Sequence, residues 1–154
     1  TDERRLTDHP HNDYGPYWSP DGKKIVFVSD RDGHDTLYTM DADGSNQVRL
    51  MPDSQWRDYR PCWSPDGTEI LFVSERSGIP LLYTIPAEGG EPTAVGSLEQ
   101  SKAYPAWASG GSRLLFSGEV SPTNWDIFLM DRAGGNAINL TIDPGFDRYP
   151  DWTP

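Results

Sequence analysis

Apolar residues along this chain occur in short runs separated by turns rich in glycine, aspartate and proline. After a first strand that ends at Trp18, the next three predicted strands are Ile25–Val28, Leu37–Met40 and Gln47–Leu50. Apolar residues stand at successive positions in the run Ile25–Val28, which is typical of a strand with both faces buried. No segment keeps a sustained apolar spacing of 3.6 residues, so we expect essentially no helix.

This pattern repeats along the whole chain. Trp18, Trp63, Trp107 and Trp152 follow one another at intervals of 45, 44 and 45 residues, and each lies two residues after a proline. Turn glycines keep the same period, at Gly44, Gly89 and Gly134. Four short strands in a repeat of this length are typical of one blade of a β-propeller, in which each blade is stabilised by its neighbours.

The repeats divide the chain into three complete blades and two partial ones. The predicted blades are residues 14–58, 59–103 and 104–148. Residues 1–13 are predicted to be the outer strand of a preceding blade, and residues 149–154 the inner strand of a following blade. The expected fold class is therefore all-β, a set of four-stranded antiparallel meanders that make half of a six-bladed ring.

Charge and composition exclude several partners. The chain has 24 acidic and 13 basic residues, a formal net charge of −11, which disfavours binding to a nucleic-acid backbone. Its single cysteine, Cys62, excludes an internal disulfide and is expected to be a buried packing residue. No apolar run approaches the roughly 20 residues that span a bilayer, so no membrane insertion is expected. The first residues also lack the apolar core of a signal peptide.

The repeated string resembles the blade repeat of TolB-like β-propellers, a WD40-like repeat family. The residues that match are Pro16–Gly33, Leu37–Gly44 and Arg49–Leu50 in the first blade, Pro61–Gly67 and Phe72–Arg76 in the second, and Pro105–Trp107 and Met130–Asp131 in the third. The third blade has Ala108–Gly111 where the Ser-Pro-Asp-Gly turn is expected.

The resemblance implies a six-bladed ring, a periplasmic or otherwise extracytoplasmic location, and binding of a protein or peptide, such as an envelope lipoprotein. Similar blades also occur in prolyl-oligopeptidase-like peptidases and in polysaccharide lyases. Because three blades leave a ring open, two accounts follow. Either two copies of the chain form a homodimer that closes the ring, or the chain is a fragment of a longer propeller.

Few residues suggest catalysis or metal binding. Asp30, Asp32 and Asp35 alternate in a turn, as in the start of a calcium loop. The second blade lacks these carboxylates and no distal glutamate follows, so a hairpin turn is favoured over a calcium site. His9, His11 and His34 lie near acidic turns without the spacing of a zinc pair. No nucleophile elbow, phosphate loop or cysteine pair is present, so we predict no catalytic residues and no cofactor.

The best candidates for a binding rim precede each inner strand, where the repeats differ in charge. These partner-binding candidates are Asp13, Asp58, Lys102 and Arg148. We predict a non-enzymatic protein- or peptide-binding propeller of TolB type. One alternative is the substrate-gating propeller of a peptidase or lyase, and another is a self-associating structural fragment.

Overall fold

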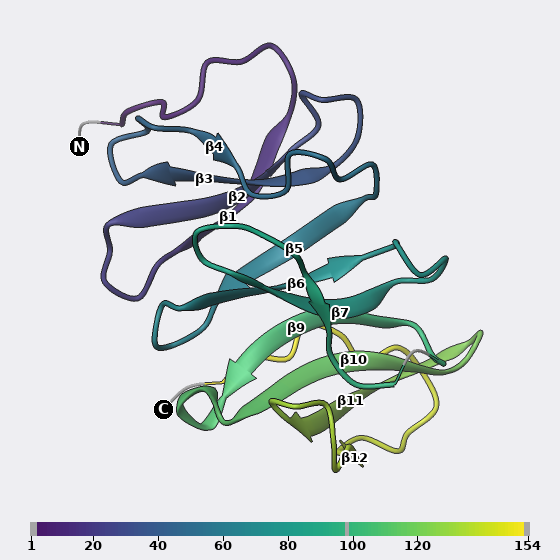
Figure 1. Cartoon of the computed structure of the whole chain (residues 1–154). Helices are drawn as coiled ribbons and strands as arrows, with labels where there is room; N and C mark the ends of the chain where they lie inside the picture. Colours follow the sequence, from purple (N-terminus) through teal and green to yellow (C-terminus); the bar gives the residue numbers. More distant parts are fainter. Residues whose placement is uncertain (1–2, 98, 153–154) are drawn as a thin grey trace.

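Three four-stranded antiparallel sheets make up this chain, as Figure 1 shows. The structure is a computed structural model, and it describes residues 3–97 and 99–152. The first sheet contains β1 (Asp13–Trp18), β2 (Lys24–Ser29), β3 (Thr36–Asp41) and β4 (Val48–Arg49). The second contains β5 (Asp58–Trp63), β6 (Glu69–Ser74), β7 (Leu81–Pro86) and β8 (Thr93–Ala94). The third contains β9 (Lys102–Ala108), β10 (Arg113–Ser121), β11 (Asn124–Asp131) and β12 (Ile138–Asn139).

Within each sheet the strands follow chain order, which is the meander expected of a propeller blade. The predicted all-β class is confirmed. In the described part of the chain the only helical element is a single turn of 3₁₀ helix, Ser109–Gly111, at the place where the third blade departs from the Ser-Pro-Asp-Gly turn. No helix among the described residues is long and apolar enough to span a membrane. The three blades form an open arc and not a closed ring.

Two apolar cores lie between the blades. In the first, Val26, Val28 and Leu37 of blade 1 pack against the second blade. In the second core, Leu71, Val73 and Leu82 of blade 2 pack against the third blade. Alternate side chains of blade 2 therefore enter two different cores. This arrangement explains why its central strands are apolar at successive positions.

The periodic turn glycines lie where one blade approaches the next. A Cβ atom at Gly44 would lie 2.6 Å from the Leu6 carbonyl oxygen, and one at Gly89 would lie 2.7 Å from that of Leu50. At Gly134 the same atom would be 2.2 Å from the Gly96 nitrogen. All three glycines also have φ near +85° to +90°, so both the backbone angle and the close contact require glycine.

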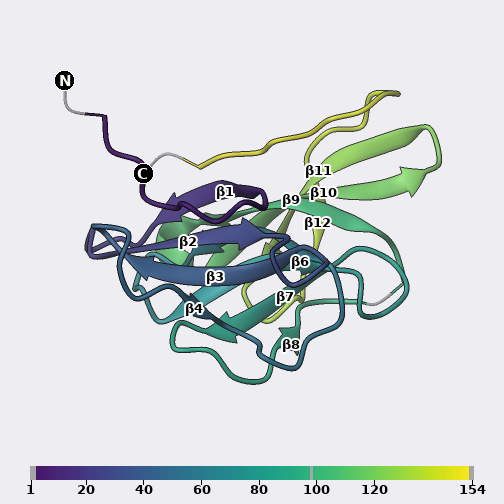
Figure 2. The ribbon, with the colours of Figure 1, turned by 90° about the horizontal axis from the view of Figure 1, so that it is seen from above.

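The two ends of the chain form no strand in the described residues. Leu6 packs against the cluster formed by Ile25, Phe27, Tyr38 and Met40 on the outer side of blade 1. Residues 147–152 form an extended segment without strand structure, as Figure 2 shows, and in Figure 1 this segment lies beside the third sheet. Residues 1–2 and 153–154 of the predicted partial blades lie outside the described part.

Candidate binding site on the axial face

The first strands of the three blades, together with residues 149–152, form one surface that we call the axial face. Two adjoining cavities open on it, of about 440 Å³ and about 490 Å³. Both are lined by Tyr17, Ala106 and Asp151. Since the innermost strands of propeller blades surround the central channel, the axial face corresponds to part of a channel wall.

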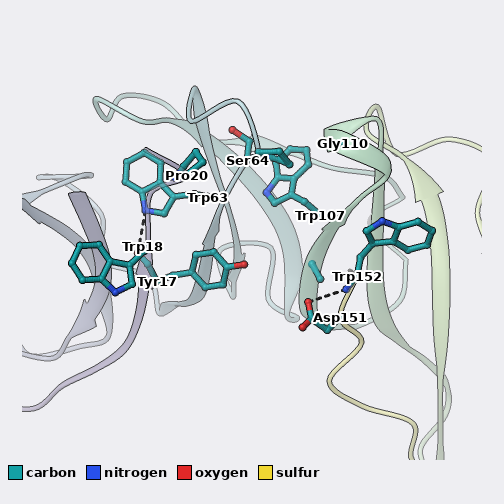
Figure 3. A pocket seen from close by; sticks show the side chains of 11 residues that line it. Tyr17, Trp18, Pro20, Trp63, Ser64, Trp107, Gly110, Asp151 and Trp152 are labelled. Carbon is teal, nitrogen blue, oxygen red and sulfur yellow. Dashed lines mark hydrogen bonds between the residues drawn. The ribbon is translucent and has the colours of Figure 1, made fainter. Parts of the chain in front are cut away.

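The first cavity is surrounded by the repeated tryptophans, as Figure 3 shows. Trp63 is 5% exposed, and its Nε1 donates a hydrogen bond to the Tyr17 carbonyl oxygen at 3.2 Å. Trp107 is also buried. In contrast, Trp18 is 53% exposed and Trp152 is 44% exposed. The same repeat position therefore provides two core residues and two exposed aromatic surfaces.

The second cavity is lined by the residues that precede the prolines of the repeat, namely Gly15, Arg60, Tyr104 and Tyr149. All four have positive φ, between +53° and +61°. The first three lie in the inner strands, where the pairing of β1 with β2, of β5 with β6 and of β9 with β10 shifts in register. For a residue other than glycine this conformation costs about 1 kcal/mol or more.

Three of these side chains form a stack. The Arg60 guanidinium lies 3.8 Å from the centre of the Tyr104 ring and 5.7 Å from that of Tyr149. The two tyrosine rings meet edge to face, with centres 4.3 Å apart. The hydrogen bond with Tyr104 lowers the pKa of Tyr149, and the positive charges of Arg60 and Arg148 act in the same direction. Arg60 and Arg148 therefore place positive charge beside Tyr149, on a chain of net negative charge.

The backbone aligns the repeats differently from the predicted blade boundaries, which begin at residues 14, 59, 104 and 149 and so treat the tyrosines there as equivalent. Tyr104 and Tyr149 share the backbone conformation of Gly15 and Arg60, not the position of Tyr14 and Tyr59. In the third and fourth repeats the two alignments differ by one residue. The difference arises because the residue before the repeat proline has a left-handed backbone, and this residue always stands at the same sequence distance before the tryptophan.

The rim residues Asp13 and Asp58 are bound within their own blades. The Asp13 carboxylate pairs with Arg31 at 2.9 Å, and the Asp58 carboxylate pairs with Arg76 at 3.0 Å. Asp58 is completely buried and also accepts a hydrogen bond from Ser54. Burial raises the pKa of Asp13, but hydrogen bonds from Ser29 and Arg31 outweigh it, so the pKa lies below its ordinary value.

Both arginines of these pairs also stack on aromatic rings. The Arg31 guanidinium lies 4.6 Å from the centre of the Tyr38 ring, and that of Arg76 lies 4.8 Å from the centre of the Tyr83 ring. Each carboxylate thus belongs to a set of one aspartate, one arginine and one tyrosine, which we call the internal lock and which occurs in the first two blades. In this arrangement their side chains have no exposed carboxylate to offer a partner.

The other two rim residues differ from this lock. Lys102 is 5% exposed, and its ammonium group donates to the carbonyl oxygens of Ser97 and Gln100. Arg148 lies over the ring of Phe146 at 4.7 Å and lines a small cavity beside Tyr104. The structure does not bring Asp13, Asp58, Lys102 and Arg148 together into one exposed patch.

Asp147, and not Arg148, is the fourth equivalent of Asp13, Asp58 and Lys102. Its backbone nitrogen donates to the Trp125 carbonyl oxygen. The backbone nitrogens of Asp58 and Lys102 donate in the same way to the carbonyl oxygens of Asp35 and Pro80. These two residues directly precede β3 and β7, the third strands of their blades. Arg148 therefore belongs to the position of Tyr14 and Tyr59.

The carboxylates considered for calcium are directed to different partners. Asp30 accepts hydrogen bonds from Asn12, Asp32 from the Tyr38 hydroxyl, and Asp35 from Arg57. No group of three or more histidine, cysteine, aspartate or glutamate side chains in residues 3–97 and 99–152 is arranged to hold a metal ion.

Cys62 is one of the residues that line the second cavity, and it is a packing residue. It is buried, and burial raises the pKa of its thiol to about 12. A thiol with so high a pKa is a poor nucleophile at neutral pH. Its Sγ instead faces the Pro105 carbonyl oxygen at 3.7 Å, across the interface between blades 2 and 3.

Comparison with known families identifies the fold. The family described as the TolB beta propeller domain matches residues 36–154, well over half of the chain. The chain belongs to this family. A TolB structure from Agrobacterium tumefaciens is similar over 91% of this chain and 52% of its own length, with 27% identity and a TM-score of 0.77. The chain thus spans about half the length of that TolB protein.

Propellers of enzymes have similar blades. An oligogalacturonate lyase from Vibrio parahaemolyticus matches 96% of this chain and 45% of its own, with 17% identity and a TM-score of 0.72. A puromycin-hydrolyzing peptidase from Mycobacterium tuberculosis matches 97% of this chain and 25% of its own, with 16% identity and a TM-score of 0.78. At these identities the similarity shows the fold alone.

Sequence reasoning missed the stack on the axial face. Arg60 is not among the predicted partner-binding residues, and the predicted blade boundaries put Tyr104 and Tyr149 at the position of Tyr59. A usable signal was present, because the residue before each repeat proline is Gly15, Arg60, Tyr104 and Tyr149. A glycine at one copy of a structural position indicates that the backbone there favours positive φ. The bulky side chains at the other copies are therefore unusual.

Proposed function

We propose that this TolB-type propeller is a non-enzymatic binding protein that holds an extended peptide or protein segment on its axial face. The observation that carries the proposal is the concentration of exposed aromatic rings around the first cavity. Tyr17, Trp18 and Trp152 are each between 44% and 53% exposed and line the same 440 Å³ space. Large aromatic side chains beside a cavity are typical anchors for peptide partners.

The described residues of the axial face contain no pair of groups suited to a chemical step. Asp151 is the carboxylate that lines both cavities, and it accepts a hydrogen bond from the Trp152 backbone. Cys62 is buried with a raised pKa. A binding role uses the aromatic surface directly, whereas a catalytic role requires residues from another domain.

Binding is best tested with the protein's own fluorescence and a matched pair of variants. We expect a short peptide of glutamate, phenylalanine, proline and glycine to change the tryptophan emission of the native protein. The variant Trp18→Ala should weaken peptide binding by about tenfold, because exposed aromatic anchors contribute on the order of 1–2 kcal/mol.

The control is Trp56→Ala. Trp56 is 51% exposed, as Trp18 is, but it lies outside both axial cavities. This variant should bind as tightly as the native protein. Equal weakening by the two substitutions would contradict a site on the axial face.

A second candidate is the propeller portion of a peptidase or lyase, favoured by the similarity of the blades to both enzymes. In that case the axial face would guide substrate to a catalytic domain. The purified chain should then bind peptides without cleaving them, as in the first candidate. The sequence that adjoins this segment in its gene distinguishes the two, since a hydrolase or lyase signature there would favour the second.

Ring completion and location are further parts of the proposal. The missing neighbours of the outer blades would come from a second copy of the chain or from additional blades of a longer propeller. The open arc of the three blades supports such a neighbour. Light scattering after size-exclusion chromatography tests the dimer, which a stable monomer at micromolar concentration would contradict. The similarity to TolB supports an extracytoplasmic location and an envelope protein as partner.

A further inference from the structure

Arg60 on the axial face stacks on a tyrosine ring, but no carboxylate among the described residues forms an ion pair with it. Arg31 and Arg76 each lie over a tyrosine ring and also pair with an aspartate, Asp13 or Asp58. Arg60 lies still closer to a tyrosine ring, at 3.8 Å from the centre of Tyr104.

Arg60 donates a hydrogen bond to the Tyr149 hydroxyl, and its other N–H groups remain available. A guanidinium group has five N–H donors arranged around the edge of a plane. The Tyr104 ring covers a face of that plane, and Arg60 itself is exposed in the second cavity. Stacking on an aromatic face fixes the plane and leaves an edge free for a carboxylate, which such an edge can bind through two parallel hydrogen bonds.

The backbone conformation at Arg60 belongs to the repeat, since Gly15, Tyr104 and Tyr149 share it, but an arginine side chain is not needed to form it. Its φ of +55° is a conformation that glycine adopts without strain, and blade 1 has Gly15 at this position with φ of +59°. The side chain of Arg60 is therefore held on the axial face in an unfavourable backbone conformation. Such strain is concentrated at functional sites, where the side chain is used.

We propose that Arg60, held by Tyr104 and Tyr149, is the anchor for a carboxylate of an acidic peptide segment bound along the axial face. This inference rests on the proposed peptide-binding function and names the class of peptide. The ligand carboxylate takes the place that Asp13 and Asp58 take in the internal locks. Arg148 adds positive charge beside Tyr149, and the exposed rings of Tyr17 and Trp18 bind the apolar side chains of the same segment.

The test compares two labelled peptides by fluorescence anisotropy. One is the short peptide of glutamate, phenylalanine, proline and glycine, and the other has glutamine in place of each glutamate. We expect the native protein to bind the glutamate peptide about tenfold more tightly, since charge-assisted hydrogen bonds are lost with glutamine. In Arg60→Gln the preference should fall to within about twofold.

A matched control is Arg113→Gln, which removes the same charge from an exposed arginine outside both cavities. This variant should keep the preference. Arg60→Gly separates binding from folding, because glycine relieves the backbone strain. It should lose the preference without a lower melting temperature, whereas a structural role for Arg60 predicts a lower one.

The possible results test the role of Arg60 and the proposed peptide binding separately. Equal binding of the two peptides by the native protein, or a preference retained in Arg60→Gln, overturns the role of Arg60 and leaves peptide binding in place. Failure of the native protein to bind either peptide overturns both.

Discussion

Trp63 and Trp18 occupy the same position in successive blades but have opposite surroundings. Trp63 lies in the core between blades 1 and 2, with its indole nitrogen bound to the Tyr17 carbonyl oxygen. Trp18 has no blade on its outer side within this chain and is 53% exposed. The comparison shows that a repeat residue acquires its role from the neighbouring blade. The same indole is a core residue inside the arc and a binding surface at its open side.

The largest expected effect tests this difference directly. Trp63→Ala should lower the free energy of unfolding by about 3–5 kcal/mol, the usual cost of removing a buried aromatic side chain. Trp18→Ala should cost below about 1 kcal/mol, since its side chain is half exposed. Urea denaturation followed by circular dichroism measures both. Similar losses for the two variants would contradict the comparison.

The next effect concerns the lock between Asp58 and Arg76. Asp58→Ala leaves a mostly buried guanidinium without its carboxylate and should cost about 3 kcal/mol. A double-mutant cycle with Arg76→Ala should show strong coupling between the two sites. Additive losses in the cycle would mean that the pair contributes nothing specific. Arg148→Ala, which breaks no ion pair among the described residues, serves as the control and should change stability little.

A smaller effect is expected at the blade junctions. Gly134→Ala places a methyl group 2.2 Å from the Gly96 nitrogen and should cost about 2 kcal/mol or more through this contact and its φ of +85°. Gly33 also has positive φ, +93°, but a methyl group there meets nothing within 4 Å. Gly33→Ala should therefore cost only about 1 kcal/mol. Equal melting temperatures for the two variants would show that the junction is not closely packed.

The smallest effect is the response of the turns to acid. Hydrogen bonds from Ser19 and Ser64 lower the pKa of Asp21 and Asp66 below the ordinary value of 3.8. A carboxyl group with a lowered folded-state pKa stabilises the protein above its unfolded pKa, and the stabilisation is lost as pH falls through the folded-state pKa. Stability should therefore decrease as the pH falls below about 4.

The third blade provides the contrast for this acid response, because Gly110 and Gly111 replace the aspartate turn there. Hydrogen exchange measured at successive pH values should show protection lost first in the turns of blades 1 and 2. The variant Asp66→Asn should make the hydrogen-exchange protection of blade 2 less dependent on pH. If blade 3 loses protection first, the aspartate turns are not the cause.

Much of this architecture was predictable from the sequence. The 44- to 45-residue repeat, the strand pattern and the turn glycines identify the blades. They repeat because the same residue types are needed wherever one blade packs against the next. Trp63 and Trp107 are examples, since both enter cores between blades. The roles of Asp58 and Lys102 were not predictable, because a charged residue before a strand is exposed in one fold and buried in another. Their partners, Arg76 and two carbonyl oxygens, are known only once the chain is folded.

The binding surface was predictable only in part. The 45-residue spacing of the predicted blade boundaries gives one register, whereas the left-handed residue before proline gives another. That one-residue difference decides whether Tyr104 packs as Tyr59 does or stacks with Arg60 on the axial face. Gly15 indicates from the sequence that the backbone at this repeat position has positive φ. The stack of Arg60, Tyr104 and Tyr149 was not predictable, because it joins residues from two inner strands and the C-terminal segment.

The six tryptophan indole N–H groups offer the most direct test of the axial site. We would record their nitrogen–proton NMR signals while adding the glutamate peptide to the isotope-labelled protein. Trp18, Trp107 and Trp152 line the first cavity, so their signals should move. The signal of Trp56 should stay in place, because Trp56 lines neither axial cavity. A shift at Trp56 with no change at Trp18 and Trp152 would contradict binding on the axial face.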